Sequence, residues 1–228
     1  MSIKINSSYR FDKIALHVAT LLLLLSCSAS LPPADPTRAA QLRNEGLKFE
    51  LRNDFVAAIQ PYKEATRYDP ENSSAYLKLA EFQEATEKPQ AAFDTYERAL
   101  QSLPSSNPDR EFILYRSALL LAEKLGKAEI AQRRLEELNN TVFQSDLAGV
   151  IALHQNESRP ALKQFQTALK QKMSPDQSAR IYFHVAQAYD QLGDEERSRQ
   201  ALLIAVPNAT SRDLKEDIKR FFEEMLAQ

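Results

Sequence analysis

The feature that most constrains the fold of this 228-residue chain is an internal repeat with a period of 34 residues. Residues 39–72 and 73–106 align without a gap, and matching positions carry alanine, tyrosine and proline in the same order. The matching pairs are Ala58 and Ala92, Tyr62 and Tyr96, Ala65 and Ala99, and Pro70 and Pro104. A fixed period of this length indicates a stack of similar units that bury their apolar faces against their neighbours.

The two units resemble the tetratricopeptide repeat, a pair of helices joined by a turn. In that family Leu42, Gly46 and Phe49 would lie on a first helix, and Ala58 and Tyr62 on a second. The resemblance implies an all-α fold, a superhelical solenoid of about five helix-turn-helix repeats with a C-terminal capping helix.

Three less regular units follow in the same register. The predicted repeats are residues 39–72, 73–106, 107–141, 142–173 and 174–209. Asn107-Pro108 is typical of a helix cap and first turn, and Ser174 to Gln177 has the form of a capping box with proline at the first helical position. Pro61 falls inside the second helix of the first repeat, where it removes a backbone hydrogen bond, so we expect a kink there.

All four glycines occupy two kinds of position in this register. Gly46 and Gly149 lie where the two helices of a unit cross. Glycine suits this position, because the missing side chain lets the backbones approach closely. Gly126 and Gly193 lie at the turn, where glycine accepts the left-handed conformation that ends a helix.

Residues 210–228 are predicted to form the capping helix. Thr210 and Asp213 can cap its start, and its apolar residues recur with helical spacing. These residues are Leu214, Ile218, Phe221, Phe222, Met225 and Leu226. The end of a repeat array needs a helix with one polar side, so we expect this helix to seal the last repeat. The alternative is a helix that binds a partner.

The N-terminal residues 1–26 have the layout of a secretory signal. Three basic residues precede the apolar segment 14–25, which is too short for a bilayer-spanning helix. The segment Leu24-Leu25-Ser26-Cys27 resembles the lipobox of bacterial lipoproteins, which implies cleavage before Cys27, the only cysteine, and attachment of acyl chains to its thiol. Two acyl chains give stable membrane attachment. The alternatives are an ordinary signal peptide with a nearby cysteine, or an uncleaved anchor.

Residues 27–38 are rich in proline and are predicted to be a tether. In enterobacterial lipoproteins an aspartate after the acylated cysteine retains the protein at the inner membrane, and this chain has Ser28. The resemblance therefore implies a lipid-anchored protein of the cell envelope, at the outer membrane and facing the periplasm. If the protein were instead secreted by a eukaryote, Asn139 and Asn208 would be glycosylation acceptors.

Charge and motif content narrow the function classes. Residues 1–26 carry three of the 29 basic and one of the 31 acidic residues, so the remainder has a formal charge of −4 and no overall attraction for nucleic acid. No catalytic or metal-binding motif occurs, and His184 is expected to be an ordinary polar surface residue. We expect no enzyme activity, no cofactor, no metal and no small-molecule substrate.

The resemblance places the partner-binding groove on the concave surface formed by the first helices. The projected groove residues are Arg43, Leu47, Glu50, Leu77, Lys78, Glu81, Arg116, Leu120, Val150, Leu153, Phe183 and Gln187. Leu47 replaces a polar member of the clamp that holds C-terminal carboxylates in some of these domains, so we expect an extended segment or helix with apolar anchors instead. The alternative is that half of these residues pack against neighbouring repeats.

The sequence therefore predicts a membrane-anchored adaptor, similar to the tetratricopeptide lipoproteins that help to assemble pilus secretins or outer-membrane proteins. Its partners would be proteins of the cell envelope. Two alternatives remain open at this stage. One is a periplasmic holdase-like chaperone for a secreted or membrane client, and the other is an enzyme whose site is not recognisable in the sequence.

Overall fold

The computed structural model describes residues 32–227, and the helices in this range form one compact unit that begins at Ala34. The predicted signal segment and Cys27 lie outside the described residues. The described range contains eleven helices and no strand, so the predicted all-α class is confirmed. The helices are α2 (Pro36–Glu50), α3 (Phe55–Tyr68), α4 (Ser73–Ala85), α5 (Pro89–Ser102), α6 (Arg110–Glu123), α7 (Ala128–Leu135), α8 (Thr141–His154), α9 (Ser158–Leu169), α10 (Pro175–Gln191), α11 (Glu195–Asn208) and α12 (Arg212–Leu226). None of the described helices is both long and apolar enough to cross a membrane.

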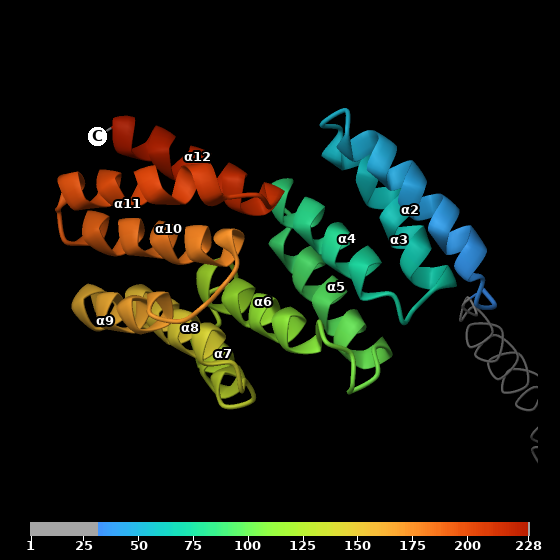
Figure 1. Cartoon of the computed structure of the whole chain (residues 1–228), viewed down its shortest axis with the longest axis horizontal. Coiled ribbons are helices and arrows are strands. Elements are labelled where there is room, and N and C mark those ends of the chain that lie inside the picture. The colour runs from blue at the N-terminus through green and yellow to red at the C-terminus, as the bar shows by residue number, and fades with distance from the viewer. Residues whose placement is uncertain (1–31, 228) are drawn as a thin grey trace, which may run out of the picture. The chain divides into compact units, whose positions relative to one another are not determined.

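The helices stack as five consecutive pairs followed by one odd helix (Figure 1). The first helices of the pairs are α2, α4, α6, α8 and α10, and the second helices are α3, α5, α7, α9 and α11. This arrangement confirms the predicted solenoid with a capping helix. The third pair is the least regular, because α7 has only eight residues.

The turn inside each pair follows one rule. A residue with positive φ ends each first helix, and a fully buried small residue follows five positions later on the second helix. The turn residues are Asn53, Glu87, Gly126, Asn156 and Gly193, and the small residues are Ala58, Ala92, Ala131, Ala161 and Ser198. The left-handed turn reverses the chain, and the small side chain lets the two helices come close.

Gly46 and Gly149 lie at the helix crossings, as predicted. A β-carbon built at Gly46 would lie 2.5 Å from Cε2 of Tyr62, and one built at Gly149 would collide with the ring of Phe165. Both rings are buried. Glycine at these two positions therefore makes room for the aromatic side chain of the second helix.

Helix starts are partly as predicted. The capping box at α10 is confirmed, because the Ser174 hydroxyl accepts from the Gln177 N–H while the Gln177 side chain accepts from the Ser174 N–H. The cap predicted at Asn107 is wrong: its side chain accepts from the Asp109 N–H in a turn, and α6 begins later, at Arg110. Helix α3 continues through the buried Pro61 to Tyr68.

The odd helix α12 does more than end the stack. Its N-terminal end reaches α4 of the second pair, and its contact with α4 is more extensive than its contact with the preceding α11 (Figure 1). The predicted cap by Thr210 and Asp213 is wrong, since Ser211 occupies the N-cap position. The N–H groups of Thr210 and Ser211 donate to the Asp176 carboxylate, which fixes the chain where α12 begins.

Candidate protein-binding face

The first helices α2, α4, α6, α8 and α10 carry the residues that were predicted to line a groove, and we call the surface they form the first-helix face. Seven of the twelve predicted residues are exposed or partly exposed. These are Arg43, Leu47, Glu50, Leu77, Lys78, Glu81 and Gln187. The other five are buried, and they are Arg116, Leu120, Val150, Leu153 and Phe183. The predicted groove therefore needs correction over the C-terminal half of the stack.

Different neighbours bury these residues, and Leu120 belongs to the core between the second and third pairs. Val150 and Leu153 belong to the core that joins the third, fourth and fifth pairs. Phe183 meets Phe221 of α12 edge to face, with ring centroids 5.6 Å apart. Helix α12 therefore occupies part of the first-helix face that was expected to be free for a partner.

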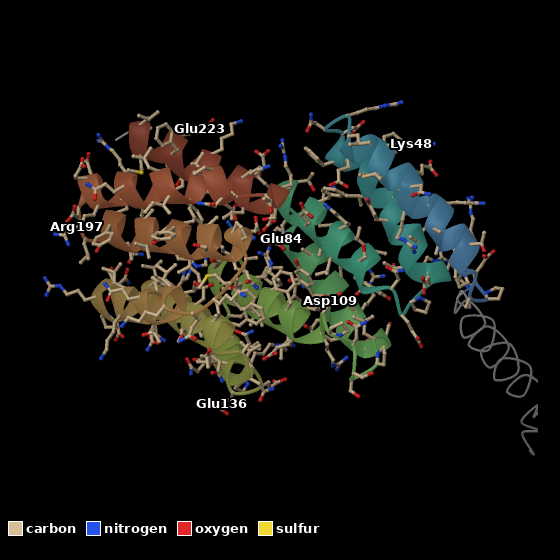
Figure 2. All side chains as sticks on the ribbon, viewed as in Figure 1. Lys48, Glu84, Asp109, Glu136, Arg197 and Glu223 are labelled. Carbon is tan, nitrogen blue, oxygen red and sulfur yellow. The ribbon has the colours of Figure 1, made fainter. Side chains whose placement is uncertain are left out.

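A buried ion network fixes α12 on this face. Asp213 of α12 accepts from Arg116 of α6 at 2.6 Å and from Arg180 of α10 at 2.7 Å, and its side chain is only 3% exposed. Arg116 also donates to Glu84 of α4 at 2.7 Å. Figure 2 labels Glu84 at the centre of the unit, beside the N-terminal end of α12. Four helices of the stack therefore meet at one set of paired charges.

The protonation behaviour of this network follows from burial and pairing. Burial alone would raise the pKa of Asp213, but the two guanidinium groups outweigh it and hold that pKa well below its usual value. Burial raises the pKa of Glu84 to about 7, although Arg116 acts in the opposite direction. Tyr96 donates its hydroxyl proton to Glu84 at 2.9 Å. Asp213 is thus the permanent anion on which both arginines depend.

His184 is the clearest correction to the sequence interpretation. It was expected at the surface, but it is 1% exposed and lies between two carboxylates. Its Nδ1 is 2.8 Å from Asp146 and its Nε2 is 2.9 Å from Glu123. Burial lowers the pKa of His184, but these carboxylates outweigh burial and raise the pKa to about 9. Tyr115 also donates to Asp146. Both ring nitrogens of the imidazolium therefore donate hydrogen bonds, and neither is free to act as a base.

The open part of the first-helix face lies on α2 and α4. Lys78 bridges the two helices, with its ammonium 2.7 Å from Glu50 and 3.2 Å from Glu81. Tyr62 donates its hydroxyl proton to Glu50, and burial together with this carboxylate raises the pKa of Tyr62 to about 12. Beside these charges Leu47 is 44% exposed. An apolar side chain next to an ordered ion row is a surface that can hold an apolar anchor of a peptide and orient its polar groups.

Sequence reasoning missed the residues that close the rest of the face. Glu84, Arg180 and Asp146 were not singled out, and Asp213 was interpreted only as a helix cap. A signal was present for Arg180, which lies between Ala179 and Ile181 on a first helix, but not for Glu84, which follows Gln83. Among residues 32–227 no three histidine, cysteine, aspartate or glutamate side chains are grouped so as to hold a metal ion.

Comparison with known proteins agrees with this architecture. The family model described as tetratricopeptide repeat matches residues 49–107 and 147–213. No curated protein matches the chain. Among solved structures, the chain is similar to one in the APC/C hetero-tetramer Cut9-Hcn1, with a TM-score of 0.57 and 17% identity over 85% of this chain and 36% of that chain. It is also similar to pilF of Pseudomonas aeruginosa, with a TM-score of 0.50 and 21% identity over 82% of this chain and 86% of that chain. These two likenesses concern the fold.

Proposed function

The chain belongs to the tetratricopeptide repeat family, and on that premise we propose that it is a membrane-anchored adaptor that gathers protein partners in the cell envelope. Tetratricopeptide proteins are scaffolds for protein–protein interaction, so the general role follows from the family. The anchor and the envelope are the further steps that we propose.

One observation supports the adaptor role most directly. Helix α12 covers only part of the first-helix face, and its N-terminal end packs on α4, where the Arg212 N–H donates to Glu81. Beside this contact the exposed Leu47 of α2 lies next to the partly exposed ion pair of Glu50 and Lys78. This mixture suits a peptide segment or helix of a partner that inserts an apolar anchor beside polar contacts. The proposed role includes no catalytic step, because His184 is enclosed between two carboxylates that occupy both of its ring nitrogens.

The membrane anchor rests on the sequence. Cys27 follows an apolar segment in a lipobox-like context, and the repeat unit starts soon afterwards, where Asp35 caps α2. An acylated Cys27 would hold the repeat unit close to a membrane surface. The Ser28 that follows supports placement at the outer membrane, facing the periplasm.

Lipid attachment can be tested by metabolic labelling. Cells that express the full chain are fed a fatty-acid probe, and the wild type is expected to take up label while Cys27→Ala is not. The matched control is Ser26→Ala, which keeps the thiol and should still be labelled. Equal labelling of the wild type and Cys27→Ala would refute the anchor but would leave the adaptor role standing.

Partner capture can be tested on the open part of the first-helix face. Leu47→Glu puts a charge where we expect an apolar anchor, and it should weaken capture by crosslinking about tenfold or more without changing the melting temperature. Leu51→Glu is the control, because Leu51 follows the same helix and is 76% exposed. One partner in fixed stoichiometry supports the adaptor, whereas many unfolded clients would identify a chaperone. Equal capture by the wild type and Leu47→Glu would move the site away from α2.

A further inference from the structure

A second surface of different character lies at the C-terminal end of the stack. Helices α11 and α12 diverge and leave between them a groove of about 720 Å³. Leu202, Leu203 and Val206 line it from α11, and Ile218 and Phe222 line it from α12. Each helix contributes one stripe with helical spacing, so the groove runs along both helices.

The apolar side chains of this groove stand out against the other repeats. Leu203 is 75% exposed, Val206 56% and Phe222 48%. Ten residues after its left-handed turn, α11 carries the pair Leu203-Ile204, whereas the four preceding repeats carry polar pairs at the same distance. Those pairs are Lys63-Glu64, Glu97-Arg98, Glu136-Glu137 and Gln166-Thr167. This pair is polar in the four preceding repeats, where it faces solvent, and apolar only in the last repeat. The change indicates that this surface of the last repeat is covered.

The shape of the groove indicates what covers it. In the preceding repeats each second helix packs directly against the first helix that follows it, whereas α11 makes only slight contact with α12. Because α12 leans on α4 rather than on α11, the side of α12 toward α11 stays open. Two apolar stripes on neighbouring helices give the groove an elongated floor, and an amphipathic helix fits a floor of this kind.

The charges at the edge of the groove indicate the composition of that helix. Arg199, Lys215 and Lys219 are the basic lining residues, and Glu223, the acidic one, pairs with Lys219 at 3.9 Å in an exposed ion pair. Glu195 pairs with Arg199 at 2.8 Å, but both side chains are more than half exposed, so this pair contributes little and can exchange partners. The edge therefore favours acidic side chains on an incoming helix.

We propose that the groove between α11 and α12 is a docking site for an amphipathic α-helix of another protein, with an apolar face flanked by acidic residues. A second copy of this chain does not suit the site, because a twofold contact would bring the same lysines of both copies together. The site is separate from the open part of the first-helix face on α2 and α4, so it does not depend on the adaptor role proposed there.

The test uses the full chain and two labelled synthetic peptides of about 18 residues. Both form the same leucine- and alanine-faced helix, but one has glutamate on both flanks and the other has lysine. Fluorescence anisotropy should show binding of the glutamate peptide and at least tenfold weaker binding of the lysine peptide. Lys215→Glu with Lys219→Glu should reverse this preference.

The apolar floor is tested with a matched pair of variants. Leu203→Asp with Val206→Asp should weaken binding of the glutamate peptide at least tenfold. Leu51→Asp with Ile130→Asp changes two exposed apolar residues that do not line the groove and should have no effect. Circular dichroism melts check that each variant is folded.

Three results would overturn the proposal. One is failure of the glutamate peptide to bind, or binding that Leu203→Asp with Val206→Asp does not weaken. Another is binding to vesicles of anionic phospholipid that these variants abolish while peptide binding is absent, which would make the groove a lipid site. The third is self-association in sedimentation that the same variants abolish, which would identify a second copy as the occupant.

Discussion

At the scale of single residues, the presence of glycine at a helix crossing determines how closely the two helices of a pair can pack. Gly149 faces the buried ring of Phe165, and Gly46 faces Tyr62 in the same way. In each case glycine leaves the first helix without a side chain at the crossing, so the second helix can place an aromatic ring there. Every repeat also carries a small buried residue on its second helix, which lets the two helices come close.

We predict that Gly149→Ala destabilises the protein by about 1–3 kcal/mol, because the new methyl group collides with a ring that has no room to move. Chemical denaturation measures the change. Phe165→Leu removes the colliding ring atoms, so the double variant should be less destabilised than the two single costs added together. Strict additivity would mean that the two residues do not touch.

His184 gives the stability of the protein a pH dependence. Its pKa lies at about 9 in the folded state and near 6.5 in the unfolded chain, so the folded state holds the proton more tightly. The stabilisation is therefore complete below about pH 6.5 and is lost as the pH rises through 9, with an amplitude of roughly 3 kcal/mol.

Denaturation should show the free energy of unfolding falling between pH 7 and pH 9. Glu84 titrates with a pKa of about 7, so its contribution changes mainly below this window. His184→Gln lowers stability at neutral pH and should flatten the slope. If the variant kept the wild-type slope, another group would be responsible.

At the scale of elements, α12 depends on one carboxylate. Asp213 is shared by Arg116 and Arg180, and all three side chains are buried. Removing it leaves two charged guanidinium groups with less compensation in a dry interior, which costs more than the loss of a surface ion pair.

We therefore predict that Asp213→Ala destabilises the protein by about 3–5 kcal/mol. Asp217→Ala, on the same helix, should cost less than about 1 kcal/mol, because the Lys124 and Arg220 with which Asp217 pairs are partly exposed. Both changes are measured by denaturant unfolding. Similar costs for the two variants would show that Asp213 does not fix α12.

At the scale of the whole described unit, α12 changes the character of the array. A simple stack of repeats is held by contacts between neighbours only. Here α12 contacts the second pair through α4 and carries the carboxylate that joins α6 to α10, so it connects repeats that are distant in the sequence. Two surfaces remain available: the open part of the first-helix face on α2 and α4, and the groove between α11 and α12.

The repeat architecture follows from features that are visible in the sequence alone. The 34-residue period, the alanines at the crossings and the two pairs of glycines are local requirements, and residues such as Ala92 and Gly149 meet them through contacts with the other helix of their own pair. Local requirements of this kind are visible in the sequence, because the residues that contact one another are close along the chain.

Only the tertiary structure decided where α12 lies and which side chains it covers. Asp213 is 97 residues from Arg116, and the backbone of Arg212 donates to Glu81, which is 131 residues away. No period links these positions, so Asp213 could be interpreted only as a cap, and Phe183 could be placed on a groove that α12 in fact covers. His184 was misjudged for the same reason: its carboxylate partners lie on α6 and α8, and what determines its burial and protonation is the packing of three helices rather than the sequence around it.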